Sequence, residues 1–170
     1  MIIRMRPTQS ELCFAQNVGM LRNTVAIRAG TPPRHGCEQN RWDVNINGAI
    51  GEMMLAKYLG IYWAGAIGDK LAADVGKYYQ VRATDHPYGK LIAHPSDVDW
   101  QPFVLARILL PEVHLVGWLW GGDAKQDEFW KTDVREPAFF AFPVNGMETL
   151  PDEDAIEQRA LDPPSTKSHT

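Results

Sequence analysis

Cysteine is nearly absent from this chain of 170 residues, which contains only Cys13 and Cys37. The two cysteines form no CxxC motif, and no histidine pair follows them at the spacing of a zinc finger. A disulfide-rich secreted scaffold and a cysteine-ligated zinc finger are therefore excluded. We expect both thiols to be buried and to stay reduced in the cytoplasm.

The chain also lacks a hydrophobic run long enough to cross a bilayer, and we expect no membrane partner. Its beginning, "MIIRMRPTQS", has no apolar segment of the kind found in a secretion signal. The composition is 45% hydrophobic and includes six Trp, six Phe and five Tyr, which argues against wholesale disorder. These features predict one folded, cytoplasmic domain with a sizeable core.

Residues 1–41 contain no lysine, so arginine is the only residue there whose side chain has a full positive charge at neutral pH. This section has a formal charge of +4, whereas residues 42–150 have −5 and residues 151–170 have −3. Guanidinium groups bind phosphate oxygens in pairs, so an arginine-only section suits contacts with nucleic acid. An ordinary solvated helix face with charged loops is the alternative. The arginines are Arg4, Arg6, Arg22, Arg28, Arg34 and Arg41.

Hydrophobic periodicity and turn residues predict two helices followed by several strands. An amphipathic helix is expected over 7–28 and a buried helix over 45–61, with a Gly- and Pro-containing loop over 29–43 between them. Apolar and alternating runs then predict strands, with a short helix or turn over 121–130. The expected strands cover residues 61–63, 71–74, 78–84, 90–94, 103–110, 112–121 and 137–144.

This order of elements predicts an α/β fold with a mixed central sheet flanked by helices. We expect one domain over 1–150, made of a basic helical arm over 1–41 and a core over 42–150. From residue 151 the composition becomes polar and acidic, which predicts a flexible acidic tail over 151–170. Several folds share this order, so the chemistry of the site has to distinguish them.

One candidate site residue stands on the second predicted helix, in "GAIGEMMLAKYLG". There Glu52 is surrounded by apolar residues, and a carboxylate is costly to bury unless it is paired or bound to a metal. A harmless acid on the helix surface is the alternative.

Two further stretches carry candidate site residues. In "DVGKYYQVRAT", strand alternation places Gln80 and Arg82 on one face, and the turn at Gly76 brings Asp74 alongside them. Carboxylate, amide and backbone carbonyl oxygens suit a hard cation such as Mg²⁺, although a polar surface hairpin would show the same pattern. In "WGGDAKQDEFW", Lys125 follows a glycine bend, which predicts either an anion site or an exposed helix start.

These motifs, in this order, resemble the PD-(D/E)XK nuclease superfamily, whose fold is that of the restriction endonucleases. The stretches "GAIGEMMLAKYLG", "DVGKYYQVRAT", "VGWLWGGDAKQDEFW" and "PAFFAFP" are also similar to a group of phage and prophage proteins of this length. The resemblance covers roughly residues 45–143. It rests on the ordered set, because each motif alone is weak.

The resemblance implies a role for each matching residue. Glu52 would help to hold the metal, Asp74 would be its central ligand, and the backbone carbonyl of Val81 would complete the set. Gln80 stands where the family has Glu or Asp, and Arg82 stands where it has Lys. Glutamine offers an oxygen without charge, so Mg²⁺ or Mn²⁺ should bind more weakly or be absent.

Arginine at position 82 also changes the chemistry that the resemblance implies. The Arg82 guanidinium stays protonated at neutral pH, so it cannot act as a general base, but it can orient a phosphate or stabilise its developing charge. Lys125 is a candidate substitute cation among the catalytic residues.

The leading hypothesis is a phage-encoded, Mg²⁺-dependent phosphodiesterase that acts on DNA in the host cytoplasm. A catalytically inactive nucleic-acid-binding protein on the same fold is the first alternative. The second is a module that binds a host protein through Trp120, Phe129 and Trp130, since aromatic anchors dominate many interfaces. The sequence also leaves a homodimer open.

Overall fold

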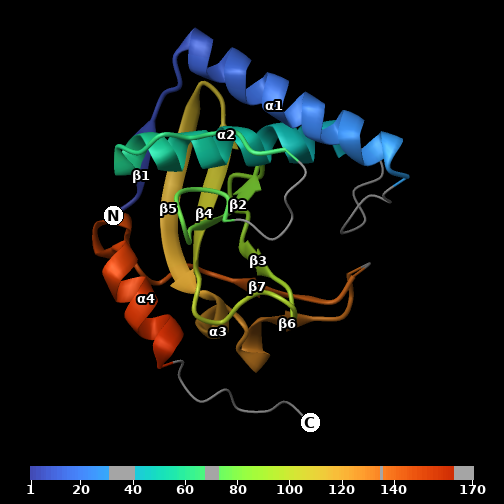
Figure 1. Cartoon of the computed structure of the whole chain (residues 1–170). Helices are drawn as coiled ribbons and strands as arrows, with labels where there is room; N and C mark the ends of the chain where they lie inside the picture. The colour runs from blue at the N-terminus through green and yellow to red at the C-terminus, as the bar shows by residue number, and fades with distance from the viewer. Residues whose placement is uncertain (31–40, 68–72, 135, 163–170) are drawn as a thin grey trace.

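The computed structural model describes residues 1–30, 41–67, 73–134 and 136–162. They form a mixed α/β fold, as the order of elements predicted, with two sheets and two long helices (Figure 1). The larger sheet has the order β1-β5-β4-β2, in which β2 and β4 are parallel and the other pairs are antiparallel. Its strands are β1 (Ile3–Met5), β5 (Glu112–Trp120), β4 (Pro102–Leu109) and β2 (Gln80–Thr84).

The smaller sheet has three antiparallel strands in the order β3-β7-β6. These strands are β3 (Leu91–Ala93), β7 (Ala138–Ala141) and β6 (Trp130–Lys131). Two short elements, α3 (Gly121–Ala124) and the 3-10 helix η2 (Asp127–Phe129), follow β5 where the sequence predicted a short helix or turn. A further 3-10 helix, η3 (Met147–Thr149), precedes the last helix, α4 (Glu153–Leu161).

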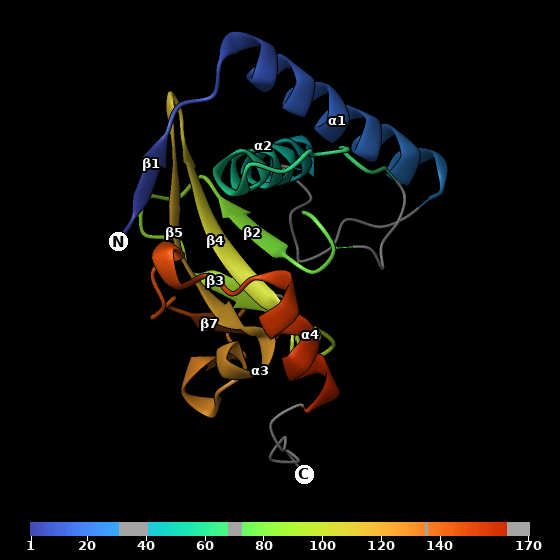
Figure 2. The same ribbon diagram turned by 60° about the vertical axis from the view of Figure 1, so that its left-hand side comes forward.

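The two long helices form separate layers on one face of the larger sheet. Figure 2 shows α2 (Arg41–Leu59) between the sheet and α1 (Gln9–Arg28). The two helices approach so closely that a Cβ atom on Gly19 would lie 2.6 Å from the Ile46 Cα. Gly51 similarly lets α2 lie against the sheet, because a Cβ atom there would be 3.2 Å from Val81. Small residues therefore set the spacing between these layers.

The two faces of the larger sheet bury different hydrophobic clusters. Along β4, Val104, Ala106 and Ile108 join the cluster that includes α1 and α2. Phe103 and Leu105 join the other cluster, which the smaller sheet covers. This alternation follows from the two-residue period of a strand, so β4 is buried on both faces.

The first helix begins at Gln9, two residues after its predicted start, for a local reason. The Thr8 side chain accepts a hydrogen bond from the Glu11 N–H, and the Glu11 carboxylate accepts one from the Thr8 N–H. This reciprocal capping box satisfies two N–H groups that a helix start otherwise leaves unpaired. The residues before it form β1, which pairs with β5, so the arginine-rich section is built into the fold.

Several expectations differ from the structure. The helix α2 begins at Arg41, within the expected loop over 29–43, and no strand forms over 61–63. The region after residue 151 contains α4, held by the fully buried Ile156, so this part of the expected tail is ordered by tertiary packing. Cys13 is exposed, because it lies on the outer face of α1; Cys37 lies outside the described residues. The expected strand over 71–74 lies largely outside them.

Within the described part of the chain, no helix is long and apolar enough to cross a membrane.

Candidate functional site

The Glu52 side chain is buried between α1 and α2, where it meets a guanidinium group. Arg22 on α1 donates from Nη1 to Oε1 at 2.6 Å and from Nη2 to Oε2 at 2.8 Å. The indole N–H of Trp63 adds a hydrogen bond to Oε2 at 3.2 Å. Only 6% of the Glu52 side chain is exposed. The predicted buried carboxylate is therefore present, and it is paired.

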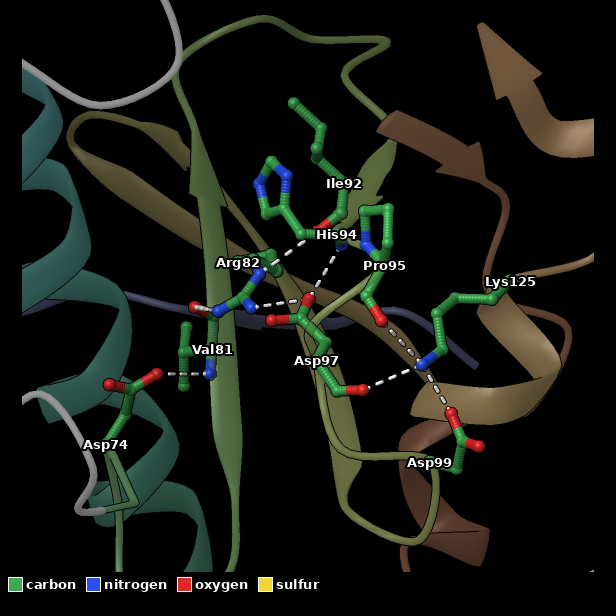
Figure 3. Close-up of polar contacts among 9 residues, drawn as sticks. All are labelled: Asp74, Val81, Arg82, Ile92, His94, Pro95, Asp97, Asp99 and Lys125. Carbon is green, nitrogen blue, oxygen red and sulfur yellow. Dashed lines mark hydrogen bonds and ion pairs between the residues drawn. The ribbon is translucent and has the colours of Figure 1, made fainter. Parts of the chain in front are cut away.

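Asp74 lies beside β2, held by a turn of the predicted kind. Val75 and Tyr79 pair across Gly76, whose φ of 57° suits a residue without a Cβ atom. The Asp74 Oδ2 atom then accepts a hydrogen bond from the Val81 N–H at 2.8 Å (Figure 3). Since N–H and C=O of one strand residue point to the same side, the Val81 carbonyl also faces this open edge of β2.

Glu52 and Asp74 are close enough to interact electrostatically. Burial raises the pKa of Glu52, the negative charge of Asp74 raises it further, and the hydrogen bonds from Arg22 oppose both effects. Burial also raises the pKa of Asp74, against the Val81 N–H bond and the positive charges of Arg82 and Arg22. We call Arg22, Glu52, Trp63 and Asp74 the Glu52 cluster. Its formal charge is −1 when both carboxylates are ionised.

Arg82 points away from this cluster, to the face of β2 that is opposite α2. Its Nε donates to the Ile92 carbonyl at 3.0 Å, and its Nη2 donates to Asp97 Oδ2 at 2.9 Å (Figure 3). The guanidinium also stacks over the Phe103 ring at 4.7 Å. Its Nη1, by contrast, lies 3.5 Å from the Val81 carbonyl oxygen, close to the edge where Asp74 is bound.

Lys125, predicted as a substitute cation, lies in a different part of the fold from Asp74. Its Nζ donates to the Asp97 carbonyl at 2.7 Å and forms an ion pair with Asp99 (Figure 3). The Asp97 carboxylate also accepts from the His94 N–H at 2.8 Å. We call Arg82, His94, Asp97, Asp99 and Lys125 the Asp97 brace, because these residues hold the turn after β3 against β2 and α3.

Gln80 shares the strand face of Arg82, as alternation predicted, because the next residue, Val81, contacts α2 at Gly51. No hydrogen bond joins the Gln80 side chain to another described residue. The structure thus brings Glu52, Asp74 and the Val81 backbone together and places Arg82 at their border. Gln80 and Lys125 are not part of that group.

A cleft of about 1070 Å³ runs along the outer edge of β2. One wall is the first half of α2, and the floor is β2 from Val81 onward together with Asp85, which follows the strand. The opposite wall includes the turn after β3 and the start of β7. Arg82 and Asp97 line the cleft, so the Asp97 brace forms part of its surface.

The atoms here that could bind a metal ion, on Glu52, Asp74 and the Val81 backbone, are all oxygens, which suits Mg²⁺ or Mn²⁺. Asp74 Oδ1 has no hydrogen bond to a described residue, and the Val81 carbonyl faces the same open edge of β2. Both Glu52 oxygens are bonded to Arg22. Among the described residues, no group of three or more Asp, Glu, His or Cys side chains is arranged to hold a metal ion. The oxygens of Asp74 and Val81 suit a cation, and Glu52 could add a further ligand only in competition with Arg22.

The arginines of residues 1–41 do not form one continuous charged strip. Arg22 is paired with Glu52, and Arg6 is paired with Glu112 at 3.0 Å. Arg4 and Arg28 are exposed. Arg34 and the Arg41 side chain lie outside the described part. Two of the predicted aromatic anchors are partly covered, since Arg159 stacks over Trp120 at 4.4 Å and Phe129 is half-buried, whereas Trp130 is exposed.

Comparisons with protein-family models, with curated proteins and with solved structures found no match for this chain.

Sequence reasoning missed residues that complete both clusters. Arg22 was counted only as a basic charge, yet it is the partner of Glu52. Its position on the inner side of the first predicted helix, one turn beyond the buried Val18, was the available signal. Asp97 and Asp99, in "HPSDVDW", are acids in a short turn, and no local pattern pairs them with Arg82 or Lys125.

Proposed function

We propose that this chain is a divalent-metal-dependent phosphodiesterase that acts on DNA, built on a restriction-endonuclease-like core. Its cation site would consist of Glu52, Asp74 and the Val81 carbonyl. The ordered set of sequence motifs supports this function, and phage origin and host cytoplasm remain part of the proposal.

One observation carries the proposal: two buried carboxylates from separate elements meet beside an open strand edge. Glu52 comes from α2 and Asp74 from the segment before β2, and each has a raised pKa. Burying an excess of negative charge is costly, and such arrangements are concentrated at functional sites. A bound cation would remove this cost.

Each residue near the edge would have a separate role. When bound, the cation would stabilise negative charge on the phosphate and supply a nucleophile at neutral pH. Asp74 would be oriented by its bond to the Val81 N–H. Arg82 would present Nη1 to a phosphate oxygen, because Nη1 has only a long bond of 3.5 Å to the Val81 carbonyl while Nε and Nη2 are held by Ile92 and Asp97.

Cleavage of plasmid and linear DNA by the full chain, with Mg²⁺ and with Mn²⁺, tests the proposal. Asp74→Asn should lower the rate by more than about 100-fold, since loss of a residue that only supports a ligand already costs 10–100-fold. Asp154→Asn is a matched control, because Asp154 is an exposed acid on α4 that does not line the cleft. Equal rates for Asp74→Asn and wild type would reject this site.

A second candidate function is DNA binding without cleavage. Arg22 favours it, because this residue is bonded to both Glu52 oxygens and thereby weakens that carboxylate as a metal ligand. Binding should weaken as salt rises, with a slope of about −0.9 in log K against log salt for each phosphate contact.

Fluorescence anisotropy with labelled duplex can locate these contacts. Replacing the exposed pair Arg4 and Arg6 by Gln should reduce affinity and make the slope less steep, whereas Lys131→Gln on β6 should not. An unchanged slope in the Arg4/Arg6 variant would exclude this section as a contact. DNA binding by a wild type that never cleaves would establish the second candidate function over the first.

A further inference from the structure

We infer that Arg22 is the resident cation of the Glu52 cluster and competes with a divalent cation for Glu52. This inference rests on the proposed function, because the competing cation is the one assigned to that site. It makes Arg22 a residue that limits metal binding, a property that neither the motif pattern nor the fold suggests.

The contacts of Glu52 use three of the roughly four acceptor sites of its carboxylate. The guanidinium fork bonds both oxygens, at 2.6 and 2.8 Å, and Trp63 adds a donor to one of them. A metal ligand needs a free lone pair directed at the ion, and distances of 2.0–2.6 Å are usual for such bonds. Arg22 and Trp63 leave only the second lone pair of Oε1 for such a bond, and the positively charged guanidinium is already bonded to that oxygen.

Arg22 is held in its position by more than Glu52. Its Nε donates to the Ala66 carbonyl at 3.0 Å, and α1 carries its backbone. Only 20% of the side chain is exposed. If the Arg22 guanidinium moved away from Glu52, its hydrogen bond to the Ala66 carbonyl would break as well. Arg22 therefore competes for Glu52 more strongly than a free surface arginine would.

The charges of the cluster point to the same competition. With Arg22 in place, the two carboxylates have one positive partner within the cluster, and the positive charges of Arg82 and Arg22 both lower the pKa of Asp74. A divalent cation added to this group would make it positive, whereas the same cation without Arg22 would neutralise it. Like charges at such short range repel, so Arg22 disfavours the cation electrostatically as well as sterically.

Titration calorimetry of the full chain with Mn²⁺ alone tests the competition. Arg22→Gln should bind Mn²⁺ at least about tenfold more tightly than wild type, a ratio typical of coupling between two binding events. Arg28→Gln removes an exposed arginine from the same helix and should bind Mn²⁺ as wild type does. Equal affinity in Arg22→Gln and wild type would overturn the inference.

Two further variants test whether a change in Mn²⁺ affinity arises at Glu52. The double variant Arg22→Gln/Glu52→Gln should lose the gain in Mn²⁺ affinity that Arg22→Gln shows. If the higher affinity persists, the cation binds elsewhere and the inference is overturned. If Arg22→Gln does not fold, Arg22→Lys replaces it in the titration. Its ammonium cannot bond both oxygens in the same way, so Mn²⁺ should bind more tightly than to wild type, and unchanged affinity would count against competition.

The inference and the proposed function fail in different experiments. Tighter Mn²⁺ binding by Arg22→Gln, with no DNA cleavage by any variant, would support the competition and reject the phosphodiesterase. Cleavage that depends on Asp74, with unchanged Mn²⁺ affinity in Arg22→Gln, would support the enzyme and reject the competition.

Discussion

Two polar clusters lie on opposite faces of β2, and their charge balance differs. In the Asp97 brace, Arg82 and Lys125 face Asp97 and Asp99, so the formal charges cancel. In the Glu52 cluster, Arg22 alone faces two carboxylates, and both have raised pKa values. A balanced set with backbone partners stabilises the fold, whereas a buried negative excess can attract a further cation.

Removing Arg22 should have the largest effect on stability. Arg22→Met leaves Glu52 buried without its partner, which should lower the free energy of unfolding by about 3–5 kcal/mol. Urea denaturation monitored by tryptophan fluorescence measures this change. The double variant Arg22→Met/Glu52→Met removes both charges and should recover most of the loss. A double variant no more stable than Arg22→Met would show that the pair is not the cause.

Breaking the Asp97 brace should have a smaller effect. Arg82→Met removes hydrogen bonds to Ile92 and Asp97 but leaves Asp97 with its His94 N–H bond and some solvent contact. We expect a loss of about 1.5–3 kcal/mol, the range for hydrogen bonds with a charged partner. Arg82→Lys, which keeps the charge, should lose less. A loss equal to that of Arg22→Met would remove the distinction between the clusters.

The pH dependence of stability should come from the Glu52 cluster. Because the folded pKa of Glu52 is raised from its usual 4.5, the folded chain binds its proton more tightly than the unfolded chain does. The resulting contribution to stability is present below about pH 4.5 and is lost as pH rises through the raised pKa. The pKa of Asp74 is also raised, from its usual 3.8, so its contribution to stability has the same sign.

Thermal unfolding from pH 4 to pH 8 measures this effect in wild type and in Glu52→Gln. The difference in melting temperature between the two should shift in favour of Glu52→Gln as pH rises. Other acids, such as Glu157 and Glu112, have lowered pKa values and contribute with the opposite sign, but they are common to both proteins. A difference that stays constant with pH would contradict the raised pKa of Glu52.

The surface pair Lys77–Glu157 should have the smallest effect of all. Its two side chains meet at 2.6 Å but are both largely exposed, so water screens the attraction. Lys77→Gln should leave the melting temperature close to that of wild type, at low and at high salt. A loss approaching that of Arg82→Met would mean that the contact of α4 with the hairpin is a main support of the fold.

Local patterns were sufficient to predict most elements of this chain. The capping box at Thr8 sets the start of α1, and the apolar runs around Pro111 predicted β4 and β5. Glu52 was identified because a carboxylate among apolar helical residues is rare. The prediction was wrong over 61–63, where the chain has strand-forming residues but no partner strand, and in α4, whose order depends on the distant contacts of Ile156.

The sequence by itself determined the α/β class, the two long helices and the hairpin that holds Asp74 next to β2. These features depend on residues within a few positions of one another, through helical periodicity, caps and turn geometry. Only the tertiary structure decided that Arg22 neutralises Glu52 and that Arg82 turns from Asp74 towards Asp97. Those pairings join residues 30 and 15 positions apart, and the packing of α1 on α2 and of the turn after β3 on β2 creates them.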